Sequence, residues 1–336
     1  SLRLVGSEMC IRDSYSATRL LGYSATYPKT RKVSHTVPNL HAMNDRVEML
    51  RVVGGVPLEG ELSVLGAKNA ALKHMVATLL APGTHHLSNV PRILDVEIMG
   101  SVLRHVGATC ERDGTALTIV VPEEPNPEAP LDLVRQMRAS ILILGTLLAR
   151  TGEARVALPG GDDFGSRPID LHLGGLEDLG AVFELQHGVL RATAPDGLHG
   201  PETYLEFPSV GAAENILLAS VLAEGTTTIG NAAREPELAD LAAYLVAMGA
   251  DIEGAGTSTV VVNGVRELHP ADHRVVPDRL EAGTYILAAA MTGGTVTIHD
   301  CVPQHLRMEM SKLADAGADV TSGDDWITVH GPDRPA

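Results

Sequence analysis

The segment AALKHMVATLLAPGTHHLSNV, residues 70–90, decides the fold because three later segments repeat its pattern. In each, a run of small and aliphatic residues leads through a glycine turn into a short strand. The later segments are ASILILGTLLARTGEARVALP (139–159), AENILLASVLAEGTTTIGNA (213–232) and EAGTYILAAAMTGGTVTIHDC (281–301). Their turns, at Gly83, Gly152, Gly225 and Gly294, recur at intervals of about seventy residues, which indicates a repeated structural unit.

A second helix and a hairpin complete each unit. Amphipathic helices that close on Gly-Ala are followed by alternating Val, Ile and Thr around polar turns, over residues 99–121, 171–194, 238–264 and 310–331. The predicted unit is therefore helix, strand, helix, strand, strand. Its first helix is apolar nearly all round, which is typical of a fully buried helix. Because one unit cannot bury its own apolar face, several must pack together, and we predict an α/β (α+β) fold with helices inside and sheets outside.

Composition narrows the class of ligand. The formal net charge is −16 and aromatic residues make up 3% of the chain, so we expect no nucleic acid partner. Small anionic ligands stay possible, because a few Arg and Lys side chains can dominate the local field. No apolar run approaches the roughly 20 residues that a membrane-spanning helix needs, and no membrane partner is expected.

Cysteine usage favours a reducing, cytoplasmic setting, and we expect no metal or other cofactor. Cys10, Cys110 and Cys301 are widely separated and lack metal-ligand spacing. Residues 1–43 differ from the rest of the chain, since they hold six Lys or Arg against two acidic residues and show no sustained periodicity. We interpret them as a disordered or non-native leader, with Met43 or Met49 as the native start.

The loop LPGGDDFGSRPIDLH, residues 158–172, combines glycines with adjacent carboxylates. Gly160 and Gly165 have the spacing of a P-loop, but the Lys that would follow is missing and two Asp residues would repel a triphosphate. A solvated acidic turn and a metal site are the remaining structural alternatives. The metal site, which we disfavour because no ligand spacing supports it, would use Asp162, Asp163, Asp170 and His172.

Basic residues at predicted helix starts are candidates for anion binding. In GAKNAAL, residues 66–72, Lys68 and Asn69 open a buried helix, whose N-terminus attracts anions. The alternative is a helix capped by Asn69 with a solvated Lys68. Arg138 opens the next buried helix, and Arg167 precedes Pro168 in GSRPID. Each guanidinium suits a phosphate or carboxylate, and a purely structural use is the alternative for both.

Seven motifs carry a resemblance to a known family. They are GAKNAAL, NVPRILDV, MRASI, LPGG…G.RPIDLH, SVGA, NAAREPE and PDR.EAGTY, and in this order they closely resemble the UDP-N-acetylglucosamine 1-carboxyvinyltransferase family. The resemblance implies two inside-out α/β barrel domains, each of three units. It also implies transfer of an enolpyruvyl group from phosphoenolpyruvate to the 3-hydroxyl of UDP-N-acetylglucosamine, with release of phosphate, in peptidoglycan synthesis. No cofactor is implied.

The resemblance also implies site residues, motif by motif. Contacts to phosphoenolpyruvate fall on Lys68, Asn69 and Arg167. Contacts to UDP-N-acetylglucosamine fall on Arg138, Arg167, Pro168, Ile169, Asp170, Leu171, Ser209, Val210 and Gly211.

Asp162 departs from the pattern of most family members, which have a cysteine at this position. A carboxylic acid can act as the general acid, so activity is not excluded, but it cannot form a thioether with an epoxide such as fosfomycin. The resemblance therefore implies Asp162 as the catalytic acid and an enzyme insensitive to fosfomycin. We expect Asp162 to be protonated efficiently only when both substrates are bound.

The family's domain boundaries predict a discontinuous second domain. Residues 44–66 and 277–336 would form it, and residues 67–276 would form a complete first domain of three units. The family continues beyond the position of Trp326 and His330, so we expect a C-terminally truncated chain with an incomplete second domain and no turnover by itself. The alternatives are an enzyme like 5-enolpyruvylshikimate-3-phosphate synthase, or a non-catalytic pseudoenzyme or scaffold that binds the sugar nucleotide.

Overall fold

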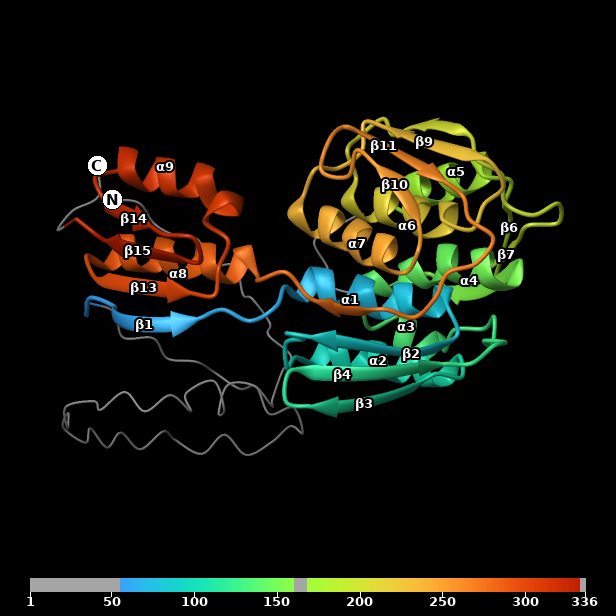
Figure 1. Ribbon diagram of the computed structural model, residues 1–336, viewed down its shortest axis with the longest axis horizontal. Helices are drawn as coiled ribbons and strands as arrows, with labels where there is room; N and C mark the ends of the chain where they lie inside the picture. Colours follow the sequence, from blue (N-terminus) through green and yellow to red (C-terminus); the bar gives the residue numbers. More distant parts are fainter. Residues whose placement is uncertain (1–54, 160–167, 333–336) are drawn as a thin grey trace, which may run out of the picture. The chain divides into compact units, whose positions relative to one another are not determined.

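The computed structural model describes residues 55–159 and 168–332 (Figure 1). Their helices and strands all belong to one compact unit, Pro57–Ala336. The predictions made for the leader, residues 1–43, and for Asp162, Asp163 and Arg167 lie outside the described residues.

The repeated unit is confirmed four times along the chain. The first consists of α1 (Lys68–Ala77), η1 (Thr78–Leu80), β2 (Gly83–Ser88), α2 (Leu94–His105), β3 (Thr109–Asp113) and β4 (Ala116–Val121). The second consists of α3 (Leu131–Val134), η2 (Arg138–Leu142), α4 (Ile143–Thr151), β5 (Glu153–Ala157), α5 (Asp170–Asp178), β6 (Val182–Gln186) and β7 (Val189–Thr193).

The third and fourth units follow the same order. The third consists of α6 (Val210–Ser220), β9 (Thr226–Gly230), α7 (Pro236–Ala247), β10 (Asp251–Glu253) and β11 (Thr259–Asn263). The fourth consists of α8 (Arg279–Thr292), β13 (Thr295–His299), η3 (Pro303–Leu306), α9 (Arg307–Asp315), β14 (Asp319–Ser322) and β15 (Trp326–His330). Three short strands stand outside this order, β1 (Glu59–Ser63), β8 (Glu202–Tyr204) and β12 (Asp272–Arg274).

Each unit forms one antiparallel sheet in which the third strand lies between the first and the second. The three extra strands join these sheets at the edge. In each case the extra strand runs parallel to the first strand of the unit: β12 beside β2, β8 beside β9, and β1 beside β13. The second unit has only an isolated parallel bridge, Glu128 to Arg155, at the equivalent place. The sequence pattern did not predict β8 or β12, because segments of three residues with mostly exposed side chains carry little periodicity.

Two of the extra strands, β12 and β1, pair with units that are distant in the sequence. β12 follows the third unit yet pairs with the first, so the first three units are joined in a ring. β1 precedes the first unit and pairs with the fourth. The two connecting segments run side by side, where the Ala67 N–H donates to the Val276 carbonyl at 2.7 Å and the Asp278 N–H donates to the Leu65 carbonyl at 2.8 Å.

The first helices of three units are buried as predicted. Every residue is buried over 70–77 in α1, 143–148 in α4 and 212–220 in α6. These helices therefore lie inside, with the sheets outside, in the inside-out α/β arrangement. α8 differs, since Leu280, Leu287 and Met291 are exposed on it, although α8 and α9 pack on the sheet of β13, β14 and β15 (Figure 1).

Two hydrophobic cores are present among the described residues. The larger gathers residues between Ala67 and Val275, and the smaller gathers Val64 with residues from Ala282 to Val329. The division between them falls on the paired connecting segments. The assignment of residues 44–66, 67–276 and 277–336 to two domains stays a prediction.

Polar side chains inside the larger core are paired across helices. Lys73 of α1 places its Nζ 3.0 Å from Oε1 of Glu214 in α6, and both side chains are more than nine-tenths buried. Asn215 of α6 accepts a hydrogen bond from the Gly145 N–H of α4 at 3.0 Å and donates to the Ile141 carbonyl at 3.3 Å. A buried charge or amide without a partner would be costly, so these contacts fix how the helices pack.

Gly145 is required by the close approach of α4 to α6. A Cβ atom there would lie 2.4 Å from the side-chain oxygen and 2.6 Å from the carbonyl oxygen of Asn215. We expect Gly145→Ala to lower the free energy of unfolding by about 1 to 3 kcal/mol, measured by urea denaturation, because the helices must separate.

Gly174→Ala is the matched control, because Gly174 also lies within a helix, α5, but a Cβ there would meet nothing within 4 Å. It should leave stability unchanged or raise it by up to about 1 kcal/mol. Equal losses in the two variants would contradict the close-packing argument.

Candidate active site

The start of α1 carries two of the predicted phosphoenolpyruvate residues. Lys68 and Asn69 are exposed in its first turn, and Lys68 forms an ion pair through Nζ with Asp95 of α2. The Lys68 backbone N–H donates to Oδ2 of Asp278 at 3.1 Å. The N-terminus of α1 is thus at the surface, with a basic side chain beside it.

The alternative in which Asn69 caps α1 is wrong. The cap position is Ala67, whose side chain can form no hydrogen bond, and Asn69 lies within the helix. The capping carboxylate comes instead from a distant residue, Asp278. Lys68 is ion-paired although its side chain is 51% exposed.

Arg138 connects the start of η2 with the start of α5 in the second unit. It opens η2, and its Nη2 donates to the carbonyl of Pro168 at 2.9 Å. Pro168 and Ile169 lead directly into α5, whose first residues are Asp170, which is exposed, and Leu171, which is half-buried. The hydrogen bond therefore holds the start of α5 against the start of η2.

The third unit brings α6 to the same place. Ser209 is its N-cap, with Oγ accepting from the Ala212 N–H at 3.3 Å. Gly211 lies over the imidazole of His172 in α5, since a Cβ there would be 3.1 Å from Cε1. Nδ1 of His172 is 3.2 Å from Nδ2 of Asn215, also in α6. The starts of η2, α5 and α6 therefore lie together, with Val210 half-buried among them.

The predicted residues thus fall into two groups. The structure brings Arg138, Pro168, Ile169, Asp170, Leu171, Ser209, Val210 and Gly211 together at three adjacent helix starts. Lys68 and Asn69 lie at the start of α1, where the contacts of Lys68 are to Asp95 and Asp278. Helix N-termini present unpaired N–H groups and partial positive charge, so both places suit anions.

Electrostatics at the three helix starts keep His172 neutral. Burial, together with the smaller effect of the positive charge of Arg138, lowers the pKa of His172 to about 4, and Asp170 opposes the shift. A neutral imidazole in contact with Gly211 adds no charge to the site. The positive potential there comes from Arg138 and the helix ends.

The metal alternative on the loop 158–172 is not tested by the described part of the chain. Asp162 and Asp163 lie outside it, Asp170 is exposed, and His172 contacts Asn215. Among the described residues, one group of three side chains has metal-ligand proximity, and it contains neither Asp170 nor His172.

Asp278 is a residue that the sequence reasoning missed. Its Oδ1 accepts from the N–H groups of Leu280 at 2.8 Å and Glu281 at 3.1 Å, while Oδ2 accepts from Lys68. One carboxylate therefore caps α8 and holds the start of α1. Asp and Glu three residues apart form the spacing of a capping box, which could have predicted the α8 cap but not the contact with α1.

Two arginines near a pocket were also not assigned. A pocket of about 420 Å³ is lined by Pro208, Asn231, Ala232, Ala233, Arg234, Glu235, Pro236 and Arg279. Arg279 pairs with Glu237, with Nε 3.1 Å from Oε1, and Arg234 is exposed. The pocket adjoins Ser209 through Pro208, so it borders the predicted nucleotide-sugar contacts.

Comparison with known proteins assigns the family. Residues 52–335 match the family model of EPSP synthase (3-phosphoshikimate 1-carboxyvinyltransferase). The chain belongs to this family. Within the EPSP synthase family, it is 52% identical over 288 residues to UDP-N-acetylglucosamine 1-carboxyvinyltransferase of Mycolicibacterium paratuberculosis, covering 86% of this chain and 69% of the relative. The enzyme of that name from Corynebacterium jeikeium is 53% identical over 284 residues, covering 84% and 68%. The resemblance predicted from the seven motifs is confirmed.

Solved structures of the EPSP synthase family share the fold. The enolpyruvyl transferase NikO from Streptomyces tendae aligns with a TM-score of 0.72 and 26% identity, covering 83% of this chain and 67% of that one. EPSP synthase from Acinetobacter baumannii aligns with a TM-score of 0.62 at 22% identity, covering 82% and 65%. Over the described residues, every helix is too short or too polar to cross a lipid bilayer.

The buried His172 makes stability depend on pH. Its pKa is about 4 in the folded chain against an ordinary 6.5, so the unfolded chain takes up the proton first as the pH falls. The contribution of His172 is complete above about pH 6.5 and is lost progressively toward about pH 4, by up to about 3 kcal/mol. We expect His172→Gln to flatten the fall in the free energy of unfolding between about pH 7 and 5, measured by urea denaturation.

His105→Gln, at an exposed position of α2, is the control and should keep the wild-type pH dependence. A His172→Gln variant with the wild-type pH dependence would show that His172 is protonated equally in the folded and unfolded chain.

Proposed function

We propose that this chain acts in the transfer of an enolpyruvyl group from phosphoenolpyruvate to the 3-hydroxyl of UDP-N-acetylglucosamine, with release of phosphate, a step of peptidoglycan synthesis. The observation that carries the proposal is the 52% identity, over 86% of the chain, to an enzyme named for that reaction. We place the reaction in the cytoplasm, since Cys110 and Cys301 are free thiols and the cysteine spacing is typical of reducing compartments.

The three adjacent helix starts support binding of the sugar nucleotide. A diphosphate carries negative charge that Arg138 and the N-termini of η2, α5 and α6 would attract. The carboxylate of Asp170 would repel a diphosphate, so we assign Asp170, with Pro168, Ile169 and Leu171, to the uridine side. Ser209, Val210 and Gly211 form a second wall, and Arg167 is assigned to both substrates.

The start of α1 supports binding of phosphoenolpyruvate. Lys68 and Asn69 are exposed there, and the ammonium group of Lys68 is paired with Asp95. An anionic substrate that binds here either replaces Asp95 as the partner of the Lys68 ammonium group or shares that ammonium group with Asp95. The ion pair holds Lys68 at the helix start before substrate arrives, which lowers the cost of ordering its long side chain.

The reaction proposed for Asp162 is an addition followed by an elimination. The Asp162 carboxyl group donates its proton to the methylene carbon of phosphoenolpyruvate as the sugar hydroxyl, which releases its own proton to solvent, bonds to the neighbouring carbon. Loss of a proton from the new methyl group to solvent then expels phosphate and restores the double bond, and the Asp162 carboxylate is reprotonated from solvent. A free Asp has a pKa of about 3.9 and efficient donation needs about 6, a difference of about 3 kcal/mol. Exclusion of water around two bound substrates would raise the pKa of Asp162, against the opposing effect of Arg167 and Lys68.

Binding of the sugar nucleotide tests the proposal without requiring turnover. We expect the purified chain to bind UDP-N-acetylglucosamine. Arg138→Ala should weaken binding by about 10- to 100-fold, because a charge-assisted hydrogen bond to phosphate is lost. Isothermal titration calorimetry measures both dissociation constants.

Arg104→Ala is the control for that titration, since Arg104 is an exposed arginine of α2 whose contact is to Ser101 within the same helix. It should bind as the wild type does. The description of the family model makes 3-phosphoshikimate the competing substrate. Binding of 3-phosphoshikimate without binding of UDP-N-acetylglucosamine would replace the proposed function with that of an EPSP synthase.

The carboxylate at position 162 predicts resistance to covalent modification by fosfomycin. With UDP-N-acetylglucosamine present, we expect no adduct on the wild-type chain and one adduct on Asp162→Cys, measured by intact-mass spectrometry with peptide mapping. Burial raises the pKa of the Cys110 and Cys301 thiols to about 11, so these side chains react slowly and serve as internal controls. An adduct that maps to Asp162 in the wild type, or an unmodified Asp162→Cys, would contradict the assignment.

A further inference from the structure

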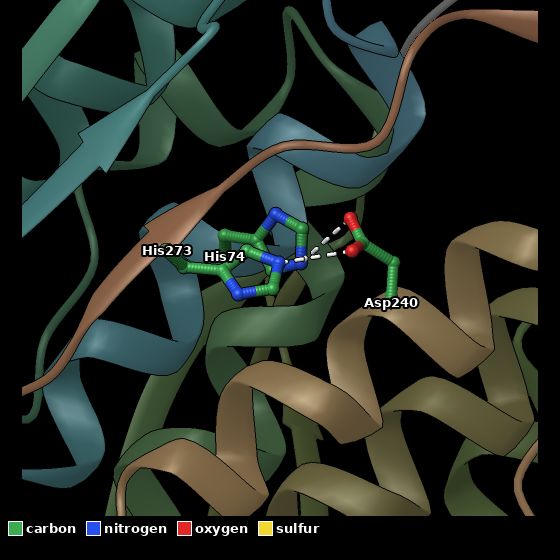
Figure 2. A group of neighbouring side chains, drawn as sticks. All are labelled: His74, Asp240 and His273. Atoms are coloured by element: carbon green, nitrogen blue, oxygen red, sulfur yellow. Dashed lines mark hydrogen bonds and ion pairs between the residues drawn. The ribbon is translucent and has the colours of Figure 1, made fainter. Parts of the chain in front are cut away.

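Three side chains from distant parts of the chain converge at the edge of the larger core. His74 lies on α1, Asp240 on α7 and His273 on β12 (Figure 2). Nε2 of His74 is 3.3 Å from Oδ2 of Asp240, and Nε2 of His273 is 2.9 Å from Oδ1. One ligand atom from each residue lies within 4.8 Å of the others. Two imidazoles thus face the two oxygens of one carboxylate.

His74 is the member of this group whose chemistry needs explanation. It is fully buried, and neither of its ring nitrogens makes a hydrogen bond within the described residues. The 3.3 Å separation from Asp240 is an ion-pair distance without hydrogen-bond geometry. Buried polar atoms nearly always have a partner. The ring of His74 lies beside the carboxylate of Asp240 and the imidazole of His273 without a hydrogen bond, which indicates a ligand that the three side chains share.

The surroundings hold the three side chains in place. The ring centroid of Tyr244 lies 5.5 Å from that of His74 and 5.2 Å from that of His273. The Tyr244 hydroxyl forms a hydrogen bond with Nδ1 of His85 at 2.7 Å. The Val276 N–H donates to Oδ2 of Asp240 at 3.0 Å, which fixes the carboxylate. Such outer contacts orient metal ligands in proteins. The side chains of Asp240 and His273 are 13% and 14% exposed, which leaves solvent access on that side.

We propose that His74, Asp240 and His273 form a binding site for one Zn²⁺ ion, with water as the fourth ligand. Zinc bonds of about 2.0 to 2.1 Å in a tetrahedron place neighbouring ligand atoms about 3.3 Å apart. Nε2 of His74 and Nε2 of His273 lie 3.3 Å and 2.9 Å from different oxygens of Asp240, and the three ligand atoms lie within 4.8 Å of one another, so the side chains have to rotate to close on one ion. Two imidazoles with one carboxylate suit Zn²⁺ rather than Mg²⁺ or Ca²⁺, which prefer oxygen ligands.

The position of the site gives the ion a structural effect. α1 belongs to the first unit and α7 to the third, and β12 is the strand that joins the third unit back to the sheet of the first. A metal bound to one residue from each would fasten the closure of the ring. The residues are too far apart in the sequence for any ligand spacing to show, which is why the sequence predicted no metal.

Metal titration of the folded wild-type chain tests the site directly. After treatment with EDTA, the chain should bind one equivalent of Zn²⁺ by calorimetry, and its Tm should rise on binding. Co²⁺ in place of Zn²⁺ should give the intense visible absorption bands of tetrahedral coordination. Failure of the folded wild type to bind one equivalent of either ion would overturn the proposal, irrespective of any enzymatic activity.

Two ligand variants locate the bound ion. Asp240→Asn and His273→Gln, both at partly exposed positions, should each weaken binding by at least about tenfold. The control is His299→Gln, since the side chain of His299 is 43% exposed and lies 3.1 Å from Glu61 in a pair with no third ligand among the described residues, and it should bind metal as the wild type does. Circular dichroism shows whether each variant is folded. Undiminished binding in both folded ligand variants would place the metal elsewhere in the chain and overturn the proposal.

Discussion

α1, α4 and α6 lie in the larger core with almost no exposed surface along their central turns, so their polar groups depend on partners inside the protein. Lys73 pairs with Glu214, and Asn215 bonds to both Gly145 and Ile141. These contacts join α1 to α6 and α6 to α4. The packing of three helices is therefore specified by a few buried polar contacts as well as by apolar surface.

Burial of the helix bodies leaves the candidate anion-binding residues at the helix ends. Lys68 and Asn69, Arg138, and the run from Ser209 to Gly211 all stand within the first turn of such a helix or just before it. Free N–H groups remain there after the rest of the backbone is satisfied. The fold thus provides several anion-attracting positions from one recurring element, and Asp278 uses the same property when it caps α1 and α8 together.

The sequence was sufficient for the repeat, the buried helices and the family, because each depends on periodicity or on contiguous motifs. It was insufficient for β8 and β12, whose three residues carry no pattern, and for the cap of α1, for which the sequence offered the neighbouring Asn69 as one alternative but gave no sign of the distant Asp278. The cluster of His74, Asp240 and His273 was missed for the same reason: its members meet only when the ring closes. Local chemistry predicts what neighbours in the chain do, whereas these contacts depend on tertiary folding.

The parallel edge strands have a consequence for synthesis on the ribosome. β1 emerges before every other described strand, but its partner β13 follows only after three complete units. During that interval β1 has an unpaired edge, and an unpaired edge can recruit other chains. Its sequence, EGELS, places Glu59 and Glu61 around Gly60, and such charges and flexibility discourage pairing with a wrong partner. The acidic residues of this strand are therefore understandable as protection of a nascent chain, in addition to any part they take in the finished sheet.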